Sequence, residues 1–304
     1  MSGDNEGTSC CASCGIAEVD DIKLKDCGDC DLVKYCSDEC RKDHKSEHEE
    51  ACEKRAAELR DELLFKQPES NHLGDCPICS LPLSLDLEKS GMYHCCSKVI
   101  CNGCAIANEI REGEMRRELS CPFCRELVPE TDEECDKRMM KRIEANDPVA
   151  LCTKGMAQCN KGEYRSAFEY FTKAAELGYA QAHFRLACMY YDGEGVQVDF
   201  GKANHHFEEA AIGGHPIARY ALGCHEKDHN SNIERAVKHW IIAATQGDDD
   251  AIKTLLGEFR EGHVSKDVLA AALRAHKAAV DETKSAQREA AESCVDLSRI
   301  VGNK

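Results

Sequence analysis

The sequence lacks three features that would place the protein in a membrane, outside the cell or on a nucleic acid. It contains no run of about 18 apolar residues, so we expect no membrane-spanning helix. The opening segment, MSGDNEGTSC, is acidic and polar, unlike a secretory signal. Basic residues are scarce, 39 against 56 acidic ones, and a net charge of −17 argues against a nucleic-acid partner bound through a basic surface. We therefore expect an intracellular protein, cytoplasmic or nuclear, without membrane or nucleic-acid partners; its oligomeric state is left open.

Cysteine, in contrast, is abundant and unevenly distributed. Seventeen of the 22 cysteines lie within residues 1–147, and only five lie in the remaining part of the chain. A reducing compartment does not maintain that many disulfides, so the pattern favours metal binding. The length of 304 residues suits two or three domains. We expect metal-binding modules in the first half and a different architecture in the second.

The first cysteine cluster has the spacing of metal ligands. Two residues between thiolates form a turn that directs both sulfurs at one ion, and three residues between ligands place both on one face of a helix. Eight ligands suit two tetrahedral zinc ions. So short a segment buries little apolar area, so the metal must supply folding free energy. The pairs are Cys11 and Cys14, Cys27 and Cys30, Cys36 and Cys40, and His48 and Cys52.

This order of pairs, with the triplet Tyr35-Cys36-Ser37, resembles a MYND-type zinc finger over residues 11–52. The resemblance implies interleaved ligation and binding of short proline-containing peptides. Arg41 and Lys45 stand where many family members carry Gln and Trp, so this chain departs from the usual peptide groove. Cys10 and His44 remain alternatives to Cys11 and His48. The implied sites are Cys11, Cys14, Cys36 and Cys40 for one zinc, and Cys27, Cys30, His48 and Cys52 for the other.

The second cluster offers eight more thiols, enough for two further zinc ions. It contains CPIC at 76–79, MYHCCSKVICNGC at 92–104 and CPFCR at 121–125, and Cys135 is spare. The motifs resemble an all-cysteine RING finger over residues 74–130. His94 with Cys96 is the alternative to adjacent Cys95 and Cys96 at the centre. The implied sites are Cys76, Cys79, Cys101 and Cys104 for one zinc, and Cys95, Cys96, Cys121 and Cys124 for the other, which brings the total to four Zn²⁺ per chain.

The RING resemblance implies a role without a catalytic side chain. RING ligases hold a ubiquitin-charged conjugating enzyme and orient its thioester, which is catalysis by positioning. Ile78 and Pro122 match the family's docking residues, and Arg125 follows the eighth ligand, where a basic residue contacts both enzyme and ubiquitin. The helix lacks the usual Trp, and Ile106 or Ile110 is its substitute. The alternative is that these residues only shape the knuckles, because CPIC and CPFC also occur in zinc ribbons.

The second half of the chain repeats itself. Gly178, Gly214 and Gly247 follow Ala-rich segments at spacings of 36 and 33 residues, and an aromatic residue precedes each in the same register. A period in the thirties with two helices per unit indicates an α-solenoid. Residues 180–215, with a G-x-G-V loop at 193–196, resemble Sel1-like repeats, which are related to TPR repeats. The aromatic residues are Phe171, Phe207 and Trp240, which we assign to the core.

We therefore predict a mainly α protein in which two small zinc-bound domains, a MYND finger and a RING-like cross-brace, precede an α-solenoid of Sel1-like repeats. The order resembles the RING–Sel1 repeat proteins of diatoms over about residues 71–295. The hypothesis is an E3 ubiquitin ligase-like factor whose other modules recruit protein partners; the alternative is a non-enzymatic scaffold. The predicted divisions are a disordered tail (1–9), the MYND finger (10–52), a helical linker (53–70), the RING finger (71–130), a linker helix (131–147), the repeats (148–262), and a capping helix with tail (263–304).

Overall fold

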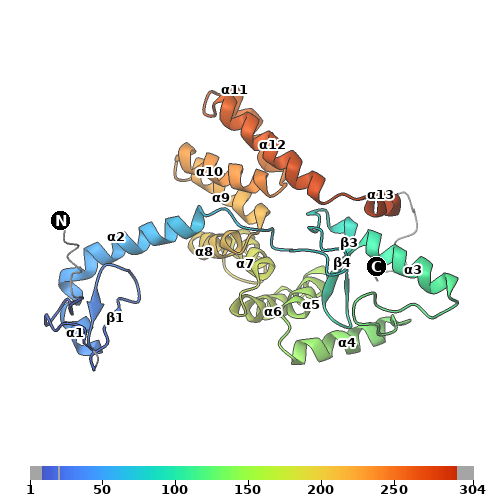
Figure 1. Ribbon diagram of the computed structural model, residues 1–304, viewed down its shortest axis with the longest axis horizontal. Coiled ribbons are helices and arrows are strands. Elements are labelled where there is room, and N and C mark those ends of the chain that lie inside the picture. Colours follow the sequence, from blue (N-terminus) through green and yellow to red (C-terminus); the bar gives the residue numbers. More distant parts are fainter. Residues whose placement is uncertain (1–8, 20, 293–304) are drawn as a thin grey trace, which may run out of the picture. The chain divides into compact units, whose positions relative to one another are not determined.

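The computed structural model describes residues 9–19 and 21–292, in two units, Met1–Lys66 and Gln67–Lys304. The protein is mainly helical, with about 60% of residues in helices (Figure 1). None of the helices in the described ranges is long and apolar enough to cross a membrane. Of the two predicted tails, residues 1–8 and 293–304 lie outside the described residues.

The first unit is a short hairpin followed by two helices. Strands β1 (Lys25–Asp26) and β2 (Lys34–Tyr35) pair antiparallel. Ser37 caps α1 (Asp38–Asp43), because its Oγ accepts a hydrogen bond from the backbone N–H of Cys40 at 3.2 Å. Helix α2 (Lys45–Leu64) starts within the finger and includes residues 53–64 of the helical linker, which the sequence predicts to extend to residue 70.

Helix α2 buries little, although it is 20 residues long. Within it, only His48 and Leu64 are buried, so an apolar face does not hold this helix in place. The guanidinium of Arg55 instead donates two hydrogen bonds to the carboxylate of Asp31, at 2.7 and 2.8 Å. The fold of this unit therefore depends on polar contacts and on the metal ions that its cysteines are expected to bind.

The second unit begins with a hairpin and a helix that enclose the second cysteine cluster. After a short 3₁₀ turn, η1 (Leu87–Lys89), strand β3 (Ser90–Tyr93) pairs antiparallel with β4 (Lys98–Cys101). Helix α3 (Asn102–Glu114) follows directly. Leu83, Tyr93 and Ile100 are buried together with the cysteine side chains, so a small apolar core surrounds the sulfurs. We call residues 71–130 the second cysteine module.

Ten further helices make up the remaining described chain, and those from α4 to α12 pack in sequence, each against the next (Figure 1). The predicted linker helix is α4, and the predicted repeats begin at α5. Gly178, Gly214 and Gly247 adopt positive φ angles of 77°, 81° and 92°, as the capping pattern predicts. The helices are α4 (Asp132–Glu144), α5 (Pro148–Asn160), α6 (Tyr164–Glu176), α7 (Ala180–Asp192), α8 (Phe200–Ile212), α9 (Pro216–Asp228), α10 (Ile233–Thr245), α11 (Asp249–Arg260) and α12 (Lys266–Glu282), with α13 (Ala286–Glu292) at the end.

Glycine lets an aromatic ring enter the space between paired helices. A Cβ added at Gly155 on α5 would lie 2.6 Å from the ring of Phe171 on α6. The same relation recurs between Gly223 on α9 and Trp240 on α10, where the distance would be 2.4 Å. Both rings are fully buried, which confirms their assignment to the core.

The Ala-rich terminal segment, residues 266–292, forms two helices. Helix α12 ends at Glu282, and α13 starts after Ser285, whose Oγ accepts a hydrogen bond from the backbone N–H of Arg288 at 3.2 Å. Helix α13 packs against α3 of the second cysteine module (Figure 1). The last helix of the described residues therefore contacts a segment nearly two hundred residues earlier in the chain.

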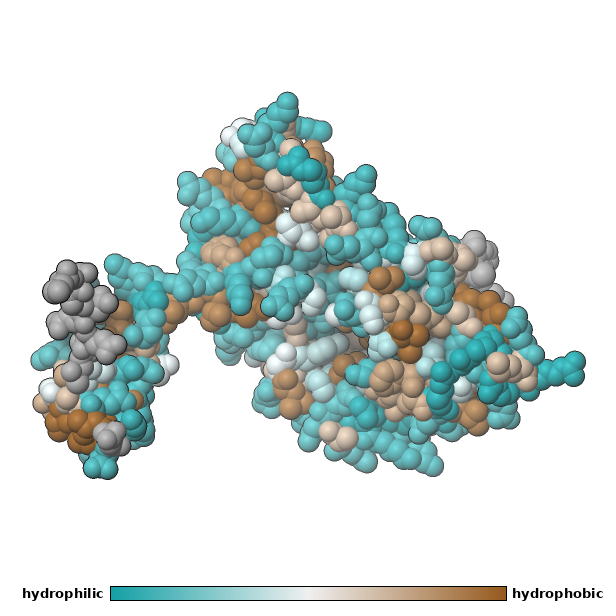
Figure 2. Space-filling view, in the orientation of Figure 1, coloured by the Kyte–Doolittle hydropathy of each residue, from teal (hydrophilic) through white to brown (hydrophobic). Residues whose placement is uncertain are grey.

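The outer surface of the second unit offers no single continuous apolar face in the view of Figure 2. Apolar residues form separate patches among hydrophilic ones. Several large apolar side chains are exposed, including Leu87 and Ile110. Single exposed apolar residues are ordinary in globular proteins, so none of them marks a site by itself.

Candidate metal centres

Sixteen predicted ligands come together in four groups. Within each group, the four ligand atoms all lie within 4.8 Å of one another. The membership of every group matches the interleaved order that the two resemblances imply. The groups are Cys11, Cys14, Cys36 and Cys40; Cys27, Cys30, His48 and Cys52; Cys76, Cys79, Cys101 and Cys104; and Cys95, Cys96, Cys121 and Cys124.

The distances between sulfurs fit a shared ion. Four ligands at a Zn–S distance of about 2.3 Å stand about 3.8 Å apart at the corners of a tetrahedron. Sulfur pairs in these groups are separated by 3.6 Å (Cys14 and Cys36), 3.7 Å (Cys27 and Cys52) and 3.8 Å (Cys79 and Cys101). A disulfide would need about 2.05 Å, and the described cysteines are all free thiols. The residues therefore fit zinc.

Local structure sets the ligand pairs of the first unit. Cys36 follows β2 and Cys40 lies on α1, while His48 and Cys52 are one turn apart on α2. The buried His48 places its Nε2 3.1 Å from the sulfur of Cys30. Its rival His44 instead uses Nδ1 for a 3.0 Å hydrogen bond with the hydroxyl of Tyr35. Cys11 is the member of its group, and Cys10 is not.

The first and last knuckles of the second module share one backbone geometry. The N–H of Ser80 donates to the carbonyl of Cys76 at 2.8 Å, and the N–H of Arg125 donates to that of Cys121 at 3.0 Å. Ser80 and Arg125 both have positive φ angles, 54° and 66°. Each CPxC segment therefore turns back on itself just after its second cysteine, which leaves both sulfurs on the inside.

The sequence left two alternatives for the central ligands of the second module, Cys95 with Cys96 or His94 with Cys96. The structure groups Cys95 and Cys96 with the last knuckle, and Cys95 lies 3.3 Å from the sulfur of Cys124. Within the described ranges, His94 belongs to no such group. The spare Cys135 also stands outside the groups, on helix α4.

Two thiols of the second module, one in each ligand group, lose their protons more easily than an ordinary cysteine. The hydrogen bond from the Cys101 side chain, assisted by backbone N–H donors, lowers the pKa of Cys76 to about 4. The hydrogen bond from Cys95 similarly lowers the pKa of Cys121 to about 5. The pKa values of Cys101 and Cys95 move upward in exchange, because each thiol donates a hydrogen bond to a neighbouring sulfur, each is partly buried, and neighbouring thiolates repel. A dication would remove that repulsion and allow all four thiols of a group to ionise.

The predicted docking residues differ in exposure. Ile78 is 42% exposed, and Arg125 is exposed with its Nη1 donating to Oδ1 of Asn108 on α3 at 3.2 Å. Pro122 is buried, and its role as a partner-binding residue stays a prediction. On α3, Ile106 is buried and Ile110 is exposed, which leaves Ile110 as the accessible apolar residue.

A further group of ligand-type side chains, Glu258, Glu261 and His263, also lies close together. Its buried carboxylate, Glu258, accepts hydrogen bonds from the Nζ of Lys227 at 2.6 Å and from Nδ1 of His263 at 2.8 Å. The ammonium group already supplies the positive charge, so this group is an ion-pair cluster.

A cleft of about 640 Å³ adjoins the second ligand group of the first unit. Its walls include Tyr35, Arg41, Lys45 and His48. Arg41 is held by Asp29, with 2.8 Å between Nη2 and Oδ2. The two residues that depart from the usual finger sequence thus line this cleft.

Comparisons with known families cover two parts of the chain. Residues 11–52 match the MYND finger model, and residues 160–179, 180–215 and 216–248 match the Sel1 repeat model. The chain carries a MYND finger and Sel1 repeats. The second and third Sel1 stretches hold the pairs α7–α8 and α9–α10. The second cysteine module lies between the matched stretches.

Two solved structures resemble the chain. One is a Sel1 repeat protein from Oxalobacter formigenes, at 22% identity over 60% of this chain and 72% of the other, with a TM-score of 0.44. The other is a protective antigen of uropathogenic Escherichia coli displaying an SLR fold, at 26% identity over 49% of this chain, with a TM-score of 0.41. This chain spans 33% of that antigen.

Proposed function

We propose that the protein is a zinc-dependent ubiquitin ligase-like factor that binds four zinc ions. The MYND finger and Sel1 repeats point to a protein-interaction scaffold, with zinc holding the finger. The finer proposal assigns the second cysteine module the role of a RING, which positions a ubiquitin-charged conjugating enzyme. The MYND finger and the repeats recruit the substrate or another protein partner.

The observation that supports the finer proposal is the accessibility of Ile78 and Arg125. Ile78 stands at the tip of the first knuckle, where its exposed side chain can enter an apolar contact on a partner. Arg125 follows the last knuckle, and its hydrogen bond to Asn108 anchors it to α3 while the side chain stays exposed. The two residues thus meet the requirements of a docking residue and of a group that orients bound ubiquitin.

A non-enzymatic scaffold is the second candidate, and the burial of Pro122 favours it. A RING that docks a conjugating enzyme uses the proline of its last knuckle as part of the contact surface. Here that proline is buried. In this alternative, Ile78 and Arg125 only stabilise the conformation of the knuckles, or they bind a protein other than a conjugating enzyme.

Discharge of ubiquitin from a preloaded conjugating enzyme to free lysine separates the two candidates. A ligase accelerates discharge with at least one enzyme of a broad panel. Truncation of Ile78 to Ala should weaken enzyme binding by roughly 5- to 150-fold, because about 1–3 kcal/mol of apolar burial is lost. Arg125→Ala should slow discharge with little change in binding of the uncharged enzyme.

Two variants serve as matched controls. Leu87→Ala removes another exposed apolar side chain of the same module, and Arg116→Ala removes another exposed arginine at a positive φ angle. Both should discharge ubiquitin at the wild-type rate. If the wild-type protein accelerates discharge from no enzyme in the panel, the ligase proposal fails and the scaffold remains.

A further inference from the structure

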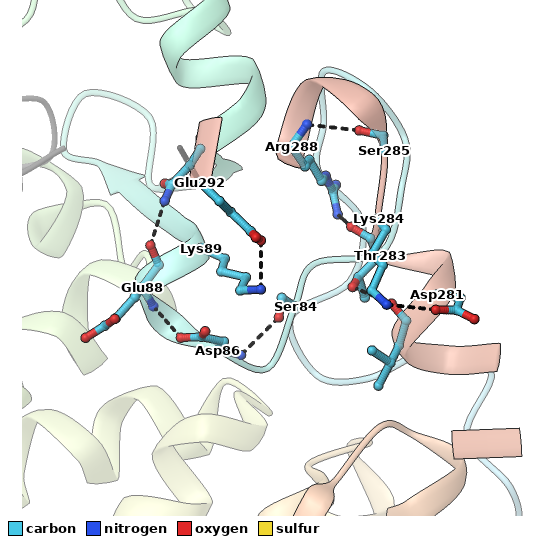
Figure 3. Close-up of polar contacts among 12 residues, drawn as sticks. Ser84, Asp86, Glu88, Lys89, Asp281, Thr283, Lys284, Ser285, Arg288 and Glu292 are labelled. Atoms are coloured by element: carbon cyan, nitrogen blue, oxygen red, sulfur yellow. Dashed lines mark hydrogen bonds and ion pairs between the residues drawn. The ribbon is translucent and has the colours of Figure 1, made fainter. Parts of the chain in front are cut away.

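A buried arginine from the last helix of the described chain reaches the second cysteine module. Arg288 on α13 is only 9% exposed. Its Nη1 donates to the carbonyl oxygens of Pro82 at 2.6 Å and Thr283 at 2.7 Å, and its Nη2 donates to that of Leu81 at 3.0 Å. The same Nη2 lies 3.3 Å from the sulfur of Cys79, a member of the third ligand group. Figure 3 shows the Arg288 side chain extending toward Thr283 from the turn that Ser285 caps.

Among the residues that the structure describes, no carboxylate forms an ion pair with Arg288. Its near acceptors are neutral carbonyl groups. A buried cation without an anionic partner is unfavourable, because it has lost its hydration. The side chain of Cys79, which zinc would bind as a thiolate, lies within 3.3 Å of Nη2. Four thiolates around one zinc dication keep two negative charges in excess, so the zinc-bound group supplies the missing counter-charge.

The backbone of α13 is fitted to its seat on the module. A Cβ added at Gly103, in the first turn of α3, would lie 3.0 Å from Cα of Arg288. The side-chain amide of Gln287 donates to the carbonyl of Gly103 at 2.9 Å. At the far end of the helix, Lys89 and Glu292 form an ion pair at 2.7 Å (Figure 3). This close fit places the guanidinium against the first knuckle in one defined position.

We propose that Arg288 is a positioning residue for the zinc ion held by Cys76, Cys79, Cys101 and Cys104, and that zinc binding at this group is coupled to docking of α13. The inference rests on the zinc occupancy in the proposed function and is independent of ubiquitin transfer. Donors to metal-bound ligands stabilise the thiolate form and typically change metal affinity by 10- to 100-fold. Because coupling is reciprocal, loss of zinc from this group should release α13. The C-terminal helix then reports the metal state of the module.

Competition with a chromophoric chelator, using full-length protein and counting the zinc retained, tests the first half of the proposal. Arg288→Met keeps the bulk of the side chain and removes its charge, so one zinc ion should become roughly 10- to 100-fold easier to remove. Arg288→Lys keeps the charge and should retain part of the affinity, which packing alone would not predict. Arg55→Met is the control, because Arg55 pairs with the carboxylates of Asp31, Glu58 and Glu62 in the first unit.

Hydrogen exchange of the backbone amides in α13 tests the second half. The helix should be protected in the zinc-loaded protein and exposed once the chelator has removed the weakest-bound ion of the Arg288→Met variant. Gly103→Ala, which crowds the seat of α13, should increase exchange of α13 and weaken the same zinc site.

The outcomes separate this inference from the proposed function. If wild-type protein holds no zinc in the third group, both the metal assignment and the coupling fail. If zinc is present but Arg288→Met and Arg288→Lys both bind it as tightly as wild type, the coupling alone is overturned. Absence of ubiquitin discharge affects only the ligase proposal.

Discussion

The imidazole rings of His72 and His215 lie stacked, with their centroids 4.0 Å apart. Both Nε2 atoms donate to the same acceptor, Oε1 of Gln181 on α7, at 3.1 and 3.0 Å. Nδ1 of His215 accepts the N–H of Ala218, and Phe184 stacks on its other face at 4.3 Å. Because Nδ1 of His215 accepts a hydrogen bond, this arrangement requires the His215 ring to be neutral. It joins the start of the second cysteine module to helix α7 and to the N-terminus of α9.

We predict that acid weakens this junction. Burial lowers the pKa of His72 to about 4 and that of His215 well below 6.5, with nearby Arg185 contributing to the latter. A histidine whose pKa is depressed by folding binds more protons when unfolded. Its contribution to stability is therefore complete above about pH 6.5 and is lost as the pH falls toward 4. For His72 alone, the free energy of unfolding should decrease by about 1 kcal/mol between pH 7.5 and pH 5.5.

Denaturant unfolding followed by circular dichroism at the two pH values checks this expectation. His72→Phe keeps a ring in the stack but cannot titrate, so its acid loss should be smaller than that of wild type by that amount. His276→Gln is the control, because His276 lies on α12 and leaves both stacked histidines in place. An acid loss in His72→Phe equal to the wild-type loss would contradict the prediction. Zinc content is measured at both pH values, so that metal release is separated from histidine titration.

A methyl group at Gly223 should destabilise the solenoid. The added Cβ would lie 2.4 Å from Nε1 and 2.7 Å from Cδ1 of the buried Trp240. Overpacking of this kind costs about 1–3 kcal/mol, and it outweighs the gain of up to about 1 kcal/mol in helix propensity. Gly257→Ala on α11 is the matched control, because its Cβ would meet no atom within 4 Å. Gly257→Ala should raise the thermal unfolding midpoint, and Gly223→Ala should lower it.

Pure, reduced protein should contain four zinc ions. Cys95→Ser should reduce the count to three, because Cys95 belongs to the fourth ligand group. His94→Ala and Cys135→Ser should both retain four ions, since neither residue joins a group. Elemental analysis gives the counts. A count of two zinc ions or fewer in the wild type would mean that one of the two cysteine modules does not bind zinc as predicted.

Removal of all zinc should leave most helices intact. The first unit buries few apolar side chains, so its fold depends on metal. The repeat helices bury Phe171, Leu186, Trp240 and Leu255 against one another without any ligand group. Circular dichroism in excess chelator should therefore retain most of the helical signal. Because the second cysteine module shares a unit with the repeats, the remaining helices should melt at a lower temperature than in the zinc-loaded protein. A complete loss of helix would mean that the metal sites also hold the solenoid together.

The sequence was sufficient wherever the deciding interactions are local. A CPxC turn brings two sulfurs together within four residues, and ligands one helical turn apart share a face, so the ligand pairs follow from spacing. The positive φ angles of Gly178, Gly214 and Gly247 likewise follow from the cap that ends each helix. The repeat period then predicts the solenoid, because each helix pair needs a neighbour to bury its apolar face.

Tertiary structure alone decided what depends on residues distant in the chain. The same CPFC motif could present Pro122 or bury it, and the surrounding elements bury it. The stack of His72 on His215 joins residues that no local pattern relates. The contact of Arg288 with Cys79 spans 209 positions, and it exists only because the chain breaks its helix near Ser285 and returns to α3. A buried charge is stabilised by the groups that the folded chain places next to it, and the spacing of residues in the sequence does not predict which groups these are.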